Sequence, residues 1–272
     1  MLRTPDAFQI DNIVEAVLSS ANYKYISPDL VRVIAAQEIA KRCKQKEAIK
    51  ATKNKLHQVG GAYLDGRDNY EEWLKTLHAV VGAGDNAEIQ QACKHIMSHH
   101  ASTRERLPIL DQFYSTLLAD FGPIHSILDL ACGLNPLALP WIPLTKGSSY
   151  YAYDIYQHVM NFLAQWLLLL NIDGHADVCD LVQSCPEQQV DVALVLKTLP
   201  CLEQVDKQAG YRLLRSINAK HMLVSFPLQS LGGKSKGMAA YYEEHFMQLI
   251  AEETWHVRKI VFASELVFVV TK

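Results

Sequence analysis

A small-residue turn and an aspartate about twenty residues further on are the first features that indicate chemistry. The apolar run SILDL leads into Ala131, Cys132 and Gly133, where a backbone can approach a ligand closely. The later run SYYAYD ends in Asp154. A carboxylate at the end of the second strand of a nucleotide-binding sheet accepts hydrogen bonds from both ribose hydroxyls. This spacing predicts a site for a cofactor that contains adenosine.

The residues after the turn narrow the choice of cofactor. A dehydrogenase usually keeps a second glycine for the pyrophosphate, and a kinase-type loop carries G-K-[ST]. Here Asn135 and Pro136 follow the turn, which favours a cofactor without phosphates, S-adenosylmethionine. Asp180 ends the next apolar stretch, ADVCDL, and is placed to bind the adenine amino group. The alternative for Asp180 is an ordinary helix N-cap.

Alternating strands and helices must position these residues. Apolar, β-branched runs alternate with helical patterns from residue 126 onward, which predicts an α/β fold with a doubly wound, Rossmann-like and mostly parallel sheet. The last two runs, joined by the short link at Ser264 and Glu265, predict an antiparallel hairpin at one edge. Strands are expected at 126–130, 150–155, 175–181, 191–197, 221–227, 256–263 and 265–270, and helices from 136 and over 110–121, 158–170, 203–217 and 238–250.

The first hundred residues carry helical patterns instead. Helices are expected over 11–19, from the Ser27 and Pro28 pair onward, and over 70–81. We therefore expect a small helical domain over 1–100, followed by the cofactor-binding domain over 101–272. A basic segment within the first domain holds a single acid, Glu47, and seven bases: Lys41, Arg42, Lys44, Lys46, Lys50, Lys53 and Lys55. A charge run is usually a solvated face, but this excess predicts RNA binding.

Length and composition exclude several classes of protein. The chain has 272 residues, 49% of them hydrophobic, and a net charge of −3 at pH 7, so it can bury a large core. Its six cysteines form no C-x-x-C pair and no metal-binding spacing with histidine, so we expect no metal site and reduced thiols in the cytoplasm. The longest apolar run, 162–170, is too short to span a bilayer, and no signal peptide is evident.

Six blocks of sequence, in order from residue 56 almost to the end, carry a family resemblance. They are LHQVGGAYL (56–64), HASTRERL (100–107), DLACGLNPLAL (129–139), LKTLPCLE (196–203), SFPLQSLGGKSKGM (225–238) and SELVFVV (264–270). Through them the chain resembles the aminoglycoside-resistance 16S ribosomal RNA methyltransferases that modify N7 of guanine 1405. The resemblance implies a helical domain that docks on the small ribosomal subunit and a methyltransferase domain that uses S-adenosylmethionine.

The resemblance also implies particular site residues. Arg106 would pair with the methionine carboxylate, and the family's glutamine after the L-P step falls on Gln204 or Gln208. Pro108 departs from the family pattern, which is tolerable if a helix starts there. The other implied cofactor contacts are Tyr63, His100, Ala101, Ser102, Ala131, Gly133, Asp154, Ile155, Asp180, Leu181, Leu196 and Lys197.

Guanine N7 carries an available lone pair, so methyl transfer to it needs no general base. The chain agrees, because LKTLP stands where amino-group methyltransferases carry [DN]-P-P-[YF]. We expect catalysis by alignment, which is worth roughly 7–11 kcal/mol, with Lys234, Lys236 and Met238 positioning the base. Transfer to another RNA atom, such as adenine N1, and a catalytically silent cofactor-binding RNA module are the alternatives. We expect a monomer that binds 16S rRNA in the assembled subunit and no membrane.

Overall fold

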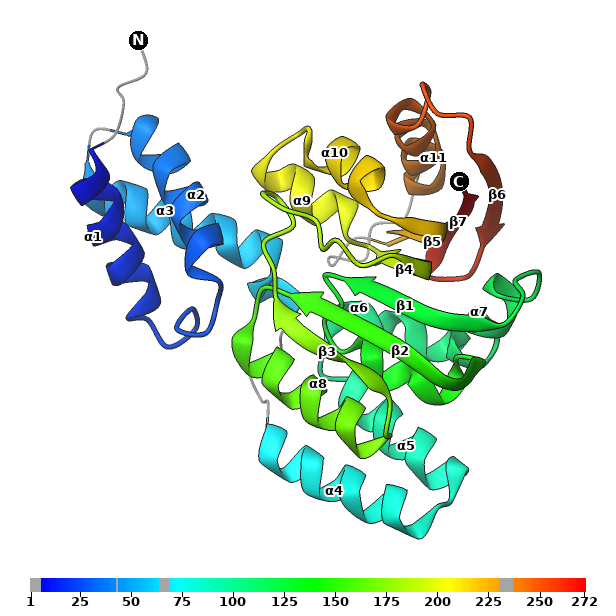
Figure 1. Ribbon diagram of the computed structural model, residues 1–272. Helices are drawn as coiled ribbons and strands as arrows, with labels where there is room; N and C mark the ends of the chain where they lie inside the picture. The colour runs from blue at the N-terminus through cyan, green and yellow to red at the C-terminus, as the bar shows by residue number, and fades with distance from the viewer. Residues whose placement is uncertain (1–5, 43, 64–68, 230–236) are drawn as a thin grey trace.

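The computed structural model describes residues 6–42, 44–63, 69–229 and 237–272. A twisted seven-stranded sheet forms the centre of the molecule, with helix α8 on one side and helices α9, α10 and α11 on the other (Figure 1). A bundle of helices α1, α2 and α3 stands beside the sheet (Figure 1). The expectation for Lys234 and Lys236 falls outside the described residues.

The order of the strands is that of a doubly wound fold. From one edge to the other the order is β3-β2-β1-β4-β5-β7-β6. Strands β1 to β5 pair in parallel, whereas β7 is antiparallel to both β5 and β6, which confirms the expected edge hairpin. All seven expected strands are present: β1 Ile124–Leu130, β2 Leu144–Asp154, β3 Asp173–Val178, β4 Val190–Leu196, β5 Ala219–Pro227, β6 His256–Val261 and β7 Glu265–Thr271.

The chain reverses its direction of winding between β1 and β4. From β1 it first proceeds to β2 and β3 on one side, and then returns to add β4 and β5 on the other. Helices leave a crevice outside the carboxyl ends of the strands at such a switch point, and ligands of open α/β sheets bind there. The turn at Ala131 and the segment after Leu196 both lie at this place.

Two of the expected helices differ from the structure. The helix expected from Pro136 is a 3₁₀ helix, η3 (Asn135–Trp141), because Pro140 lacks an N–H and its ring clashes with the carbonyl four residues earlier. The helix expected over 203–217 is two helices, α9 (Leu199–Val205) and α10 (Ala209–Ser216). They are separated at Asp206, whose backbone is extended and whose carboxylate accepts from the Gln208 N–H at 2.9 Å.

The other expected helices are present and differ from the sequence patterns only at their ends, whereas α5 (Asn86–Met97) and α6 (Ala101–Arg106) were not expected. The Ser27 hydroxyl accepts from the Leu30 N–H at the start of α2, where Pro28 is the first residue, so the expected start is confirmed. Pro108 lies in a 3₁₀ turn, η2 (Leu107–Ile109), that leads into α7. The helices are α1 Ala7–Leu18, α2 Pro28–Ala40, α3 Gln45–Val59, η1 Gly61–Tyr63, α4 Tyr70–Ala83, α5 Asn86–Met97, α6 Ala101–Arg106, α7 Leu110–Leu117, α8 Gln157–Leu169 and α11 Met238–Leu249.

Contacts divide the first hundred residues into two groups. Helices α1, α2 and α3 pack on one another, whereas α4 and α5 pack against α8 and η3 of the sheet domain. The domain boundary near residue 100 stays a prediction, because packing alone does not define which part folds independently.

Backbone hydrogen bonds join the three-helix bundle to the segment that follows β2. The Ser27 N–H donates to the Ile155 carbonyl at 2.8 Å, and the Gln157 N–H donates to the Tyr25 carbonyl at 2.9 Å. Helix α3 also contacts α9, where the Lys55 ammonium donates to the Gln204 carbonyl at 3.0 Å. The bundle is therefore attached at the carboxyl edge of the sheet, next to Asp154.

We expect Gly174→Ala to destabilise the fold. Gly174 in β3 has a φ of 122°, and a Cβ there would lie 2.0 Å from the Tyr150 carbonyl oxygen of β2. Backbone strain and overpacking each cost on the order of 1–3 kcal/mol, so urea unfolding followed by circular dichroism should show a loss of at least about 2 kcal/mol. Gly122→Ala is the control, because its Cβ would meet nothing within 4 Å. Equal stabilities of the two variants would contradict the tight β2–β3 approach.

Candidate functional site

A cavity lies at the switch point, beside the carboxyl ends of β1, β2 and β4. Its empty volume, which includes open solvent at its mouth, is about 680 Å³. Ala101, Arg106 and Gly133 are not among its lining residues. The other ten expected cofactor contacts line it: Tyr63, His100, Ser102, Ala131, Asp154, Ile155, Asp180, Leu181, Leu196 and Lys197.

The lining residues that sequence reasoning missed are mostly apolar. They include Leu30 of α2 and Val59 at the end of α3, so the helical bundle forms part of the wall. Their sequence signal is only that of buried positions on amphipathic helices, which does not separate a cavity wall from a core. The others are Gly60, Tyr156, Cys179, Val182, Thr198, Cys201 and Leu202.

Asp154 connects the turn after β1 to the segment after β2. Its Oδ2 accepts from the Gly133 N–H at 2.9 Å and its Oδ1 from the Ile155 N–H at 2.7 Å. Burial raises the pKa of Asp154, while these backbone donors oppose the rise. Each carboxylate oxygen has a second lone pair, so the group can still accept from both hydroxyls of a ribose. These residues fit an adenosine-containing cofactor.

His100 packs directly against the turn after β1. A Cβ at position 133 would lie 2.6 Å from His100 Cε1, so only glycine allows this approach. Burial, together with the charges of Arg106 and Lys197, lowers the pKa of His100 to about 3, and the ring is therefore neutral. The Tyr63 ring stacks on it at a centroid distance of 5.9 Å. The two rings form one side of the cavity.

Asp180 lies two residues beyond β3 and lines the cavity. Its Oδ1 accepts from the Val182 N–H at 3.0 Å and its Oδ2 from the Gln183 amide at 2.8 Å. Residues 181–183 form a turn, so the alternative reading of Asp180 as the N-cap of a helix is wrong. A contact with the adenine amino group stays a prediction.

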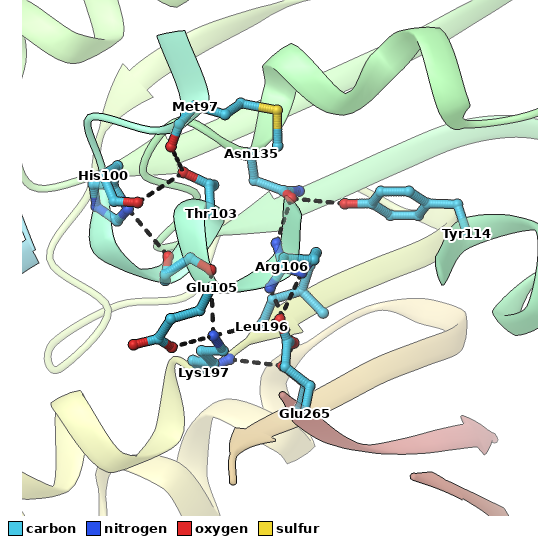
Figure 2. A network of polar contacts seen from close by, with 12 residues as sticks. Met97, His100, Thr103, Glu105, Arg106, Tyr114, Asn135, Leu196, Lys197 and Glu265 are labelled. Atoms are coloured by element: carbon cyan, nitrogen blue, oxygen red, sulfur yellow. Dashed lines mark hydrogen bonds and ion pairs between the residues drawn. The ribbon is translucent and has the colours of Figure 1, made fainter. Parts of the chain in front are cut away.

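Arg106 is held by the protein itself. Its side chain is 1% exposed, and its Nε and Nη2 donate to the two carboxylate oxygens of Glu265 at 2.8 and 3.1 Å (Figure 2). Its Nη1 donates to Asn135 Oδ1 at 2.8 Å. Burial alone would raise the pKa of Glu265, but the charges of Arg106 and Lys197 lower it overall. The expected pairing of Arg106 with a methionine carboxylate stays a prediction.

Lys197 follows β4 with a φ of 60°, in the left-handed region. Its ammonium donates to Glu105 Oε2 at 2.7 Å and to the Ser102 carbonyl at 3.2 Å, and lies 3.4 Å from Glu265 (Figure 2). Two cations, Arg106 and Lys197, thus share the Glu265 carboxylate beside the cavity. Glu105 is a site residue that the sequence analysis did not single out.

Acidic side chains pair with three of the seven bases of the segment. Lys41 and Arg42 both pair with Glu38 of α2, which is 6% exposed, and Lys44 lies 3.6 Å from Glu47. The count of acids within residues 41–55 therefore omitted Glu38, and with Glu38 and Glu47 both included the seven bases still exceed the two acids by five.

The other four bases of the segment divide into two pairs. Lys53 donates to the Ser20 hydroxyl and Lys55 to the Gln204 carbonyl, so both are half-buried within the protein. Lys46 and Lys50 of α3 are exposed, and no acid pairs with them among residues 6–42, 44–63, 69–229 and 237–272. RNA contacts of the segment stay a prediction, for which Lys46 and Lys50 are the best placed.

A second cavity adjoins the first and shares Tyr63, Lys197 and Cys201 with it. Met238, expected to position the base, lines this cavity together with Gln204. Gln208 is exposed and lines neither cavity. The cofactor contact expected of Gln204 or Gln208 stays a prediction.

Two features are absent from the described part of the chain. No helix there combines the length and the apolar character that crossing a bilayer requires. Nor do those residues bring together three or more histidine, cysteine, aspartate or glutamate side chains in a metal-binding arrangement.

Comparisons with known proteins agree with this geometry. Residues 19–269 match the family described as ribosomal RNA methyltransferase (FmrO). The 16S rRNA (guanine(1405)-N(7))-methyltransferase of Micromonospora rosea is 36% identical over 97% of both chains, and that of Frankia casuarinae is 40% identical over 97% of this chain and 94% of its own. The solved structure of the 16S rRNA methyltransferase RmtF with S-adenosyl-L-homocysteine has 30% identity and a TM-score of 0.82, covering 98% of this chain and 99% of that chain.

We expect Asp154→Ala to weaken the binding of S-adenosylmethionine roughly 10- to 150-fold, because a hydrogen bond to a charged group is worth about 1.5–3 kcal/mol. Isothermal titration calorimetry would measure the change. Asp177→Ala removes a largely exposed carboxylate of β3 and serves as the control. Unchanged affinity in a folded Asp154→Ala protein would show that this carboxylate does not hold the ribose.

Proposed function

Because the chain belongs to the ribosomal RNA methyltransferase (FmrO) family, we propose that it transfers a methyl group from S-adenosylmethionine to N7 of guanine 1405 in 16S rRNA. The observation that carries the proposal is the identity of 36–40% to proteins named for this reaction over 97% of the chain. The cavity at the switch point, with Asp154 and Asp180 in its wall, supports it independently. Under this proposal, the methylation of guanine 1405 confers resistance to aminoglycosides.

The residues of the cavity suit a transfer that needs no proton removal. When bound, the cofactor supplies a methyl group on a positively charged sulfur. Burial raises the pKa of Tyr63 and of the Cys179 and Cys201 thiols, so these three groups keep their protons near neutral pH. The lowered pKa of His100 makes its neutral ring a weak base. The chain's own contribution is to bind, to orient and to exclude water.

The proposed substrate is 16S rRNA within the assembled small subunit, and the enzyme is proposed to act as a monomer in the cytoplasm. A base inside a duplex must be flipped to reach the cofactor, which costs a few kcal/mol and favours a separate docking surface. The bundle of α1, α2 and α3 supports this role, because it is joined to the cavity wall and presents Lys46 and Lys50 to solvent.

Incubation of small ribosomal subunits with the protein and labelled S-adenosylmethionine tests the proposed function. We expect one methyl group per subunit, located at guanine 1405 by primer extension and at N7 by mass spectrometry. A methyl group on another atom, such as adenine N1, would replace the proposal with the first alternative. Tight binding of subunits and cofactor without transfer would support the silent module.

We expect the single-turnover methylation rate to change less than about twofold between pH 6.5 and 9, because the reaction needs no general base that must first be deprotonated. Rapid-quench measurements at saturating cofactor and subunits would give the rate. A general base would instead produce a limb that rises about tenfold per pH unit. Such a limb would identify an amino nitrogen or a hydroxyl as the target.

We expect the Lys46→Glu and Lys50→Glu double variant to bind small subunits at least about tenfold more weakly, with unchanged cofactor affinity. Each neutralised phosphate releases counterions, so wild-type binding should also fall steeply with salt. The double variant Lys75→Glu and Lys146→Glu has the same charge change on exposed lysines of α4 and β2 and is the control. Equal binding of both double variants would show that α3 is only a solvated face.

A further inference from the structure

The second cavity adjoins the first and shares part of its wall. Tyr63, Lys197 and Cys201 line both. The first cavity carries the groups suited to a cofactor, and the second carries two more aromatic or apolar surfaces, Tyr242 and Met238, and the carboxylate of Glu105. Its empty volume, which includes open solvent, is about 650 Å³. A base held there would lie next to the bound cofactor.

Glu105 is the acidic side chain in this second cavity. Its side chain is 29% exposed, and its Oε2 accepts from the Lys197 ammonium at 2.7 Å. Its Oε1 has no hydrogen-bond partner within the described residues, and Figure 2 shows it directed away from the polar network. An acid at a surface that meets RNA is repelled by phosphates, so it is costly there unless it binds donor groups. Lys197 offsets its charge from the protein side.

Two adjacent donors on a base distinguish guanine from the other three bases. The N1–H and the N2 amino group lie side by side on its Watson–Crick edge, whereas adenine and cytosine present a ring-nitrogen acceptor at the corresponding place. A carboxylate accepts from both guanine donors, because each oxygen has two lone pairs and Oε2 keeps one free beside Lys197. A flipped base is read along this edge by hydrogen bonds and held by stacking on aromatic side chains.

We propose that the second cavity is the guanine pocket of the enzyme and that Glu105 selects guanine by accepting from its N1–H and N2 amino groups. Tyr242 and Tyr63 supply aromatic surface for the base. The inference rests on the proposed function and deepens it, because it assigns the recognition of the base to a residue outside the cofactor site.

Glu105→Gln separates this role from a merely structural one. The amide oxygen of glutamine can keep the hydrogen bond from Lys197, and its NH₂ then replaces Oε1 and faces the guanine donors. We expect the single-turnover rate on guanine subunits to fall at least about a hundredfold, because a site built for hydrogen bonds rejects an unmatched edge strongly. Cofactor affinity by calorimetry and the unfolding midpoint should stay close to wild type. Glu187→Gln, at an exposed position, is the matched control.

Subunits reconstituted with adenine at the target position supply a readout that a structural defect cannot produce. Adenine also has a nucleophilic N7, and its N1 acceptor matches the NH₂ of glutamine. We expect the wild type to prefer guanine subunits strongly and Glu105→Gln to reduce the ratio of guanine to adenine rates by at least about a hundredfold. This change in ratio does not depend on the overall activity of the variant.

Several outcomes would overturn the inference. Equal methylation of guanine and adenine subunits by the wild-type enzyme would overturn the inference before any variant is made. So would a Glu105→Gln protein with the wild-type preference, or one whose rate falls only in step with its cofactor affinity. If the wild type leaves N7 of guanine 1405 unmodified, the proposed function fails and this inference fails with it. Normal wild-type transfer with an unaltered variant defeats the inference alone.

Discussion

The buried ion pair between Arg106 and Glu265 holds together the edge of the sheet at which both cavities open. The two side chains are 1% and 0% exposed, so each charge has lost nearly all of its hydration. Loss of one partner from such a pair costs about 3–5 kcal/mol, since an uncompensated charge remains buried. Glu265 begins β7 and also accepts from the Ser225 hydroxyl of β5 at 2.8 Å. The pair therefore fixes α6 against the antiparallel edge of the sheet.

A chain of hydrogen bonds extends this pair across the parallel strands. Asn135 accepts from Arg106 and donates to Asp129 of β1 at 2.9 Å, and the Tyr150 hydroxyl of β2 donates to the same Asp129 oxygen at 2.6 Å. Burial raises the pKa of Asp129 to about 6. Ala131 and Lys197 follow β1 and β4 with φ values of 52° and 60°, and such residues cost on the order of 1–3 kcal/mol each. Strain of this size persists in the wall of the cavity because hydrogen bonds and ion pairs hold the surrounding residues in place.

Local patterns predicted the sheet, because parallel strands buried on both faces are continuous apolar runs. The same patterns located Asp154, the last residue of β2, and Asp180, which follows β3. Local patterns failed where a distant or single residue decided the outcome, as with Pro140, which turns the expected α-helix into η3. The environment of Arg106 depends on Glu265, 159 residues away, and no spacing rule connects the two.

Long-range contacts also explain why the sequence analysis missed the acidic partner of the basic segment and the role of Glu105. Glu38 neutralises Lys41 and Arg42 from the preceding helix, so the net charge of a sequence window overstated the charge of the surface. Glu105 was not singled out because its partner Lys197 lies 92 residues away in the sequence, and only the fold brings the two together.

The proposed docking helices and the cofactor-binding cavity are in direct contact in this fold. The segment directly after Asp154 pairs with the residues before α2, and Val59 and Gly60 at the end of α3 form part of the cavity wall. A Cβ at position 60 would lie 2.9 Å from both Ile155 Cδ1 and Tyr156 Oη, so the end of α3 approaches the segment after Asp154 closely. In the proposed docking, RNA bound to α3 would therefore lie on a helix that packs against the segment next to Asp154. The cavity is completed by the same helices that are proposed to hold the ribosome, and the two surfaces form one structural unit.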